Sequence, residues 1–122
     1  MNVALWISTI LVSVVFLFSG VVKSLLPRDR LIASGQTGIG PFPMPLVRLV
    51  ALCELAAVVG LFAPWLSDIA RPLTPVAALG LCGVMYGAAI SHASLREPKQ
   101  TGAVIAILII CGFIAAGRFA QL

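Results

Sequence analysis

Glu54 is the residue most suggestive of chemistry, because it is an ionisable side chain in the middle of a long apolar stretch. A charged group at the centre of a membrane helix costs at least about 2.5–3.5 kcal/mol if it faces lipid. Glu54 is therefore expected to face inward and to have a partner. Ala51 and Ala57 share its helical face, and their small side chains leave room beside the carboxylate for another side chain or a ligand.

Lys23 and His92 are the candidate partners of Glu54, since they close two other apolar stretches toward the same end of the expected bundle. Glu54 lies eight residues inside its own stretch, about 12 Å deep at about 1.5 Å per residue, and a lysine reaching along its helix closes much of that distance. Arg48 competes, but its position six residues before Glu54 is an awkward angle on a helix. Lys23, Glu54 and His92 together predict a semi-buried polar pocket, open toward one side of the membrane.

Such a pocket could hold a quinone head group, relay a proton or anchor an anionic ligand. A structural interpretation also stays open for each residue. Lys23 could extend to the interface from a helix end, His92 could touch headgroups or water, and Glu54 could belong to a purely structural ion pair.

Other site chemistries find little support in the sequence. Cys53, Cys82 and Cys111 lie in apolar runs without a CxxC pair, which argues against a disulfide framework or a zinc site. The single histidine excludes bis-histidine haem ligation within one chain. No nucleophile beside a base and no glycine-rich phosphate loop is present. The sequence thus predicts no catalytic residue, no metal ligand and no cofactor, apart from a quinone at an interface.

The elements that must position these residues are four apolar stretches. Hydrophobic residues make up 61% of the 122 residues, and the mean hydropathy is +1.13, whereas soluble domains are about 45–50% apolar. About 20 residues span a bilayer as a helix. The sequence predicts an all-α membrane protein, a four-transmembrane-helix bundle in one domain over 1–122, with helices at about 3–26, 46–63, 73–91 and 103–117. The net charge of +4 includes no basic cluster long enough for nucleic acid, so the expected partner is the lipid bilayer.

The break between the first two helices is the longest, over residues 28–45. Its alternating prolines, 41–45, exclude a regular helix, and its apolar residues favour contact with the bundle or the membrane. We expect a proline-rich loop that is interfacial or re-entrant, with Leu31, Ile32, Ile39 and Phe42 as its apolar side chains. Pro64 is expected to end the second helix.

The basic residues are distributed unevenly, six near the first and third loops against two at the other end. Cytoplasmic loops of membrane proteins carry an excess of Lys and Arg, so loops one and three are predicted to be cytoplasmic and both termini outside, in a bacterial inner membrane. The six are Lys23, Arg28, Arg30, Arg48, Arg96 and Lys99, and the two are Arg71 and Arg118.

Small residues recur at four-residue spacing in the third stretch, at Gly83, Gly87 and Ser91, and in the fourth at Gly112 and Ala116. Small residues at this spacing allow two membrane helices to approach closely. Packing within one chain is the favoured interpretation, and a homo-oligomer through Gly83, Gly87 and Ser91 is the alternative.

The pattern resembles the DoxX-like family of small four-span membrane proteins. The resemblance rests on FSGVVK at Phe18–Lys23, LCEL at Leu52–Leu55 with VGL at Val59–Leu61, and GAAISH at Gly87–His92. It implies a four-helix bundle and an accessory or anchoring subunit of a membrane-bound oxidoreductase complex, with other membrane subunits as partners and a contact to quinone. The alternatives are a stand-alone binder or transporter of a small hydrophobic or anionic ligand, and a membrane-assembly factor.

Overall fold

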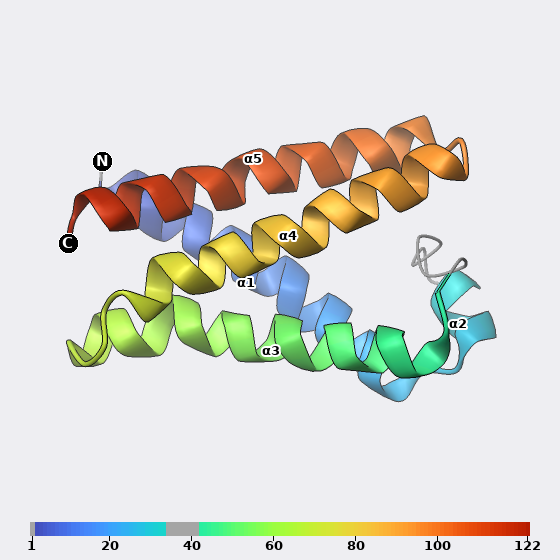
Figure 1. Ribbon diagram of the computed structural model, residues 1–122, viewed down its shortest axis with the longest axis horizontal. Helices are drawn as coiled ribbons and strands as arrows, with labels where there is room; N and C mark the ends of the chain where they lie inside the picture. The colour runs from blue at the N-terminus through green and yellow to red at the C-terminus, as the bar shows by residue number, and fades with distance from the viewer. Residues whose placement is uncertain (1, 34–41) are drawn as a thin grey trace.

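The computed structural model describes residues 2–33 and 42–122, and these residues form helices joined by short links. The long helices are α1 (Asn2–Leu25), α3 (Met44–Ser67), α4 (Leu73–Ser94) and α5 (Pro98–Ala120), and a short helix, α2 (Arg28–Ala33), follows α1 (Figure 1). Each of the four long helices has the length and hydropathy to cross a membrane. The predicted all-α, four-span membrane bundle is therefore confirmed.

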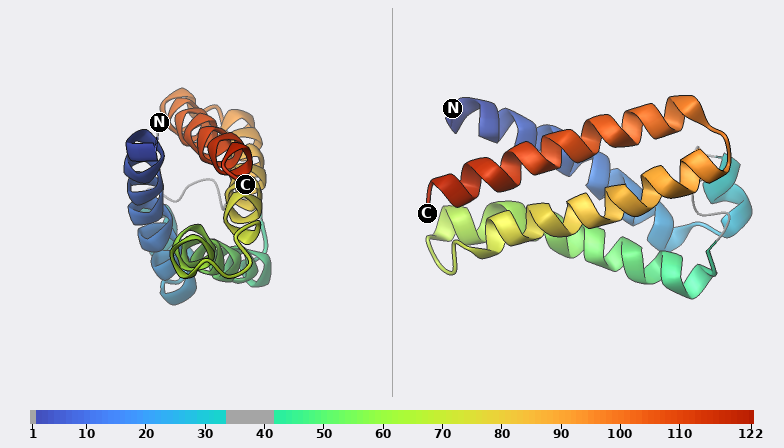
Figure 2. Two further views of the ribbon diagram at one scale, coloured as in Figure 1. Left: turned by 90° about the vertical axis from the view of Figure 1, so that its left-hand side faces the viewer. Right: turned by 45° about the horizontal axis from the view of Figure 1, so that its top comes forward.

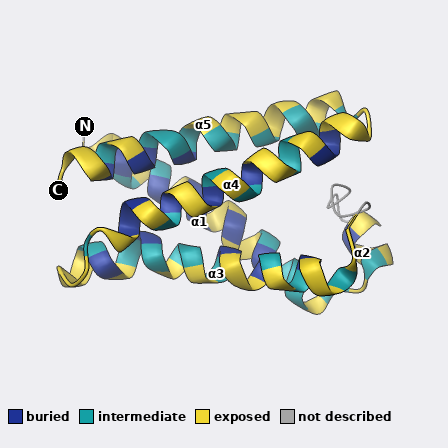
Figure 3. Cartoon of the chain, in the orientation of Figure 1, coloured by how far each residue is buried: buried dark blue, intermediate teal, exposed yellow. Residues whose placement is uncertain are grey.

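The four long helices form a ring rather than two stacked pairs. Seen end-on in Figure 2, α1 neighbours α3 and α5, and α4 neighbours the same two helices from the opposite side. Both chain ends lie at one end of the bundle, which we call the terminal end; α2 and the α4–α5 link lie at the other, the α2 end (Figure 1). Buried residues lie where the helices face one another, and in α5 they are confined to its C-terminal half, whereas exposed residues cover the outer faces (Figure 3). Exposed apolar faces suit a lipid solvent.

The helices extend beyond their apolar cores, because hydropathy marks the part inside lipid rather than the last hydrogen-bonded turn. α4 continues to Ser94 and α5 starts at Pro98, where the sequence predicted an end at 91 and a start at 103. Proline suits a first turn, since its fixed φ is helical and its missing N–H is not needed there. Pro98 therefore begins α5, and the extension places Gln100 on a helix.

Pro64 does not end the second membrane helix, contrary to the sequence expectation. α3 continues to Ser67 with Pro64 inside it. Proline there leaves the carbonyl of Gly60 without its usual helical donor. The buried Thr74 of α4 supplies the replacement, as its Oγ1 donates to the Gly60 oxygen at 2.9 Å. A hydroxyl from a neighbouring helix thus lets the helix pass through a proline.

The break between α1 and α3 is partly helical, which the sequence did not predict. α2 follows Pro27 directly, and its Leu31 is fully buried against Val47 of α3. Pro43 is extended and caps α3, so Met44 and Pro45 belong to the first turn of that helix rather than to an irregular loop. Of the apolar residues expected in an interfacial or re-entrant loop, Ile39 lies outside the described residues, whereas Leu31, Ile32 and Phe42 lie within them.

Candidate functional site

Lys23 and Glu54 form an ion pair between α1 and α3, as the sequence predicted for an intramembrane carboxylate. The Lys23 ammonium donates to Glu54 Oε1 at 2.8 Å, and the side chains are 11% and 0% exposed. The other carboxylate oxygen, Oε2, is buried and has no hydrogen-bond partner within the described part of the chain. Pairing lets a charge reside at this depth, whereas the second oxygen keeps unused capacity to accept a proton or a donor.

A close approach of α1 and α3 positions this ion pair. Gly20 lies one turn before Lys23, and a Cβ there would fall 2.7 Å from Leu55 Cγ and 3.2 Å from the Ala51 oxygen. Real Cβ atoms essentially never come so close, so only glycine permits this helix spacing. This close approach of the two helices brings the Lys23 ammonium within hydrogen-bond distance of the Glu54 carboxylate.

Arg48 does not pair with Glu54. Its guanidinium Nη1 donates instead to the backbone carbonyl of Lys23, near the end of α1. The last carbonyls of a helix lack donors within the helix, and a cation beside them also compensates the negative end of the helix dipole. Arg48 therefore holds the backbone of Lys23, while the lysine side chain is left to Glu54.

His92 does not contact Glu54; it pairs with Glu97, a partner that the sequence did not indicate. His92 Nδ1 lies 2.9 Å from Glu97 Oε1, with side-chain exposures of 10% and 21%. The turn after α4 brings them together: Glu97 N donates to the His92 carbonyl, and Arg96 takes a left-handed φ of 57°. A five-residue separation does not match one helical face, so periodicity alone could not have found this pair.

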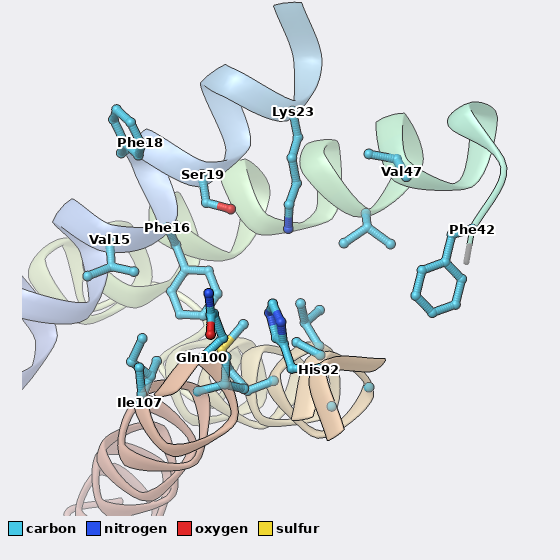
Figure 4. Close-up of a pocket in the computed structure, with 18 of the residues that line it drawn as sticks. Val15, Phe16, Phe18, Ser19, Lys23, Phe42, Val47, His92, Gln100 and Ile107 are labelled. Carbon is cyan, nitrogen blue, oxygen red and sulfur yellow. The ribbon is translucent and has the colours of Figure 1, made fainter. Parts of the chain in front are cut away.

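A cavity of about 940 Å³ lies between the helices at the α2 end. Side chains from α1, α3, α4 and α5 line it, mostly apolar, and Lys23 and His92 both reach it (Figure 4). Gln100 of α5 and Ser19 of α1 add polar atoms to the same wall. The structure therefore brings Lys23 and His92 to one cavity, with Glu54 behind the lysine; Gln100 was missed because the fourth helix was expected to begin after it.

The cavity owes part of its width to glycines on α4. Gly80, Gly83 and Gly87 line it, and a Cβ added at any of them would meet nothing within 4 Å. The expectation that Gly83 and Gly87 pack against a helix of the same chain is therefore wrong. Three missing side chains on one face leave an open groove beside the polar wall.

Exposed residues of α1 and α5 line the cavity on the side where these two helices separate. The two helices meet at the terminal end, where a Cβ at Gly117 would lie 2.4 Å from a Leu5 methyl carbon, and they separate toward α2 (Figure 2). Val14 and Phe18 of α1 line the cavity although they are 64% and 62% exposed. A molecule dissolved in the surrounding lipid would therefore reach the cavity without crossing water.

A second polar cluster, which the sequence analysis did not predict, occupies the terminal end. Arg118 is 0% exposed, and its guanidinium carbon lies 4.6 Å from the ring centroids of both Trp6 and Trp65. Its Nη1 donates to Asn2 Oδ1 at 3.1 Å and to Gln121 Oε1 at 2.8 Å. Aromatic faces attract a cation, which explains how this arginine is held although no carboxylate of the described residues forms an ion pair with it.

Arg71 joins the same cluster from the α3–α4 link. Its guanidinium carbon is 4.0 Å from the Trp65 centroid, and its Nε is 3.4 Å from Asp68 Oδ1. The Trp65 ring is thus in contact with two guanidinium groups, those of Arg71 and Arg118. The cluster ties both chain ends to the α3–α4 link and closes the bundle at this end.

Metal and thiol chemistry have no visible centre in the described residues. Across 2–33 and 42–122, no group of three or more His, Cys, Asp or Glu side chains could hold a metal ion. Cys53, Cys82 and Cys111 are free thiols. Cys82 faces α5, with its sulfur 4.0 Å from the Leu108 oxygen.

These features define a four-span integral membrane protein with an intramembrane ion pair beside a mostly apolar cavity. The family model of the DoxX-like family matches residues 7–114, and the chain belongs to that family. The match includes Lys23, Glu54 and His92. Comparison with curated proteins and with solved structures found no match.

Proposed function

We propose that this DoxX-like protein binds a membrane-dissolved amphiphile, of which a quinone is the leading candidate. The observation that supports this most is the cavity of about 940 Å³ with apolar walls and a small group of convergent polar side chains. Sites for small molecules are typically apolar clefts of about 300–1,000 Å³ with few polar groups that fix orientation. The apolar part of the ligand would lie along the α4 glycines.

The polar head of the ligand would lie between Lys23, His92 and Gln100. The Lys23 ammonium has three N–H donors and uses one on Glu54, and the Gln100 amide offers two more. Such a donor-rich wall suits the carbonyl oxygens of a quinone head. In this proposal Glu54 holds the lysine in place rather than touching the ligand.

We further propose that the chain is an accessory or anchoring subunit of a membrane-bound oxidoreductase complex, with the redox centres in partner chains. Family membership supports this, as does a cavity that would present a quinone to a neighbour. Gentle extraction followed by mass spectrometry should find the protein with larger membrane subunits. Recovery only as a monomer or a self-oligomer would contradict the subunit role and leave ligand binding to be judged separately.

A stand-alone binder or transporter of an anionic amphiphile is the second candidate. The specific observation in its favour is the Lys23 ammonium at the cavity wall, since a cation suits a carboxylate or phosphate head. A role as a membrane-assembly factor requires no ligand at all. In that case the cavity variants below would leave function unchanged.

The direct test is ligand-induced stabilisation of the protein in nanodiscs. A short-chain ubiquinone should raise the unfolding free energy by about 2.7 kcal/mol at a hundred times its Kd, and an alkyl carboxylate of equal length tests the anionic alternative. Gly83→Leu should abolish the stabilisation, because its side chain enters open cavity space. Gly112→Leu is the matched control, as its Cβ also meets nothing within 4 Å but it does not line the cavity.

The outcomes separate the candidates. Loss of ligand-induced stabilisation in Gly83→Leu but not in Gly112→Leu supports binding of the ligand in the cavity. Equal responses in both variants, or no response of the unchanged protein to either ligand, would overturn the proposal. Glu54→Gln should weaken the response as well, since it loosens the lysine that the head contacts.

A further inference from the structure

The pairing of His92 with Glu97 connects the cavity wall to the surface at the α2 end. His92 lines the cavity and is 10% exposed, whereas Glu97, at the start of α5, is 21% exposed. Their contact, Nδ1 to Oε1 at 2.9 Å, joins the interior to the more exposed position. Ligand binding as proposed above leaves this pairing without a role.

The contact decides which ring nitrogen is available to a ligand. When Glu97 is ionised, its carboxylate only accepts hydrogen bonds, and the ring nitrogen that faces it, Nδ1, then carries the ring proton. Nε2 of the neutral ring is then an acceptor. A base held by a carboxylate in this manner is the arrangement that enzymes use to take up a proton.

The charges around His92 come from every neighbouring element. Lys23 of α1 reaches the same cavity but is already paired with Glu54 of α3. Arg48 of α3 is engaged with the Lys23 carbonyl, and Arg28 of α2 donates to the Phe42 oxygen at 2.5 Å. Gln100 of α5 is neutral. Arg96 and Lys99, which flank Glu97, are exposed. The carboxylate that contacts the imidazole is that of Glu97.

We infer that His92, positioned by Glu97, exchanges a proton with a hydroxyl head group bound in the cavity, and this rests on the proposed function. The ligand O–H bond breaks and its proton joins Nε2. The electron pair stays on the ligand oxygen, which becomes an oxyanion beside the Lys23 ammonium. Glu97 accepts the Nδ1 proton of the imidazolium and passes it to water at the α2 end, which leaves a neutral ring protonated at Nε2. In the reverse sequence a proton enters at Nδ1 and the Nε2 proton goes to the ligand. The substrate class is thus an amphiphile with an acidic hydroxyl, such as a quinol or an alkylated phenol.

An optical probe can report the proton directly. An alkyl-hydroxyquinoline N-oxide is an amphiphile whose absorption differs between its hydroxyl and oxyanion forms. At a pH at which the free probe keeps its hydroxyl proton, the probe bound to the unchanged protein in nanodiscs should show the oxyanion spectrum. At a saturating concentration of the probe, His92→Gln should show the hydroxyl spectrum, because Nε2 is no longer there to take up the proton. Glu97→Gln should need a higher pH for the oxyanion spectrum, because no carboxylate then stabilises the imidazolium.

The short-chain ubiquinone, which has no hydroxyl proton to give, is the control ligand. Stabilisation of His92→Gln by saturating ubiquinone shows that this variant is folded and keeps its cavity, so a lost oxyanion spectrum then reports lost proton exchange. An oxyanion spectrum that persists in His92→Gln would overturn the inference while leaving the binding proposal intact. Failure of both ligands to bind the unchanged protein would overturn both.

Discussion

Lys23 and Glu54 show which part of the site follows from sequence and why. A lone carboxylate in lipid must be paired, so the sequence predicted an inward Glu54 with a lysine from the same end, and the structure places them 2.8 Å apart. His92 was correctly predicted at this end of the bundle, but as a partner of Glu54, whereas it contacts Glu97. Its partner depends on the tight turn through Arg96, which helical periodicity does not describe.

Removing one partner of this ion pair should be worse than removing both. Lys23→Met should lower the unfolding free energy by about 3–5 kcal/mol, because it leaves Glu54 buried and unpaired. The double variant Lys23→Met with Glu54→Leu should recover most of that loss. Unfolding curves in mixed detergent micelles measure both. A double variant as unstable as Lys23→Met alone would show that the pair itself stabilises the fold.

Arg118 carries a second prediction about a buried charge. Arg118→Lys keeps the charge but loses the planar group that contacts two tryptophan rings and two amide oxygens. We expect a loss of about 1–3 kcal/mol in unfolding free energy. Arg96→Lys, an exposed substitution at the other end, is the control for arginine loss in general. Equal effects of the two would contradict the assigned contacts, and near-ultraviolet circular dichroism would follow Trp6 and Trp65 directly.

Among the helices, α3 shows where reasoning from single segments stops. Proline after an apolar run predicted a helix end, but Thr74 of another helix replaces the missing donor to Gly60. That contact exists only once α3 and α4 are packed, so no local rule contains it. The α4 glycines illustrate the same limit: their spacing indicated close packing, and only the arrangement of four helices shows that they border a cavity.

The pairing of Thr74 with Pro64 predicts a compensating double variant. Thr74→Val should lower the unfolding free energy by about 1–3 kcal/mol, because the Gly60 carbonyl loses its donor in a buried position. Pro64→Ala restores a backbone N–H that can donate to the same carbonyl. Thr74→Val should therefore be milder in the Pro64→Ala background. Thermal unfolding of the four proteins of this cycle measures the coupling, and simple additivity would refute the contact.

At the level of the bundle, the two ends differ in structure: the terminal end is closed, and the α2 end contains the cavity. The terminal end is closed by Arg118, its tryptophans and the tight contact of Leu5 with Gly117. The α2 end holds the ion pair, the His92–Glu97 contact and the cavity. Composition sufficed to predict the four-span bundle. It could not predict which end would open, since that depends on the path of α1 past α5.

The charge difference between the ends predicts a membrane orientation. We propose that the α2 end is cytoplasmic, because six basic residues lie near it against two at the terminal end. With Cys53, Cys82 and Cys111 replaced by alanine, a cysteine at Ser67 should react with a membrane-impermeant maleimide added to intact cells. A cysteine at Lys99 should react only after the membrane is opened. The reverse pattern would invert the assignment.

If a ligand enters the cavity from the bilayer between α1 and α5, its concentration in the lipid determines how much of it binds. A ligand that enters from the bilayer would meet the cavity at its mole fraction in lipid, not at its concentration in the surrounding buffer. Occupancy would then follow the ratio of ligand to phospholipid, and adding empty vesicles would dilute the ligand without changing the aqueous volume. Two ligands of equal intrinsic affinity would differ in apparent potency by their partition coefficients alone. The amount of lipid would thus determine the total ligand concentration at which the cavity becomes saturated.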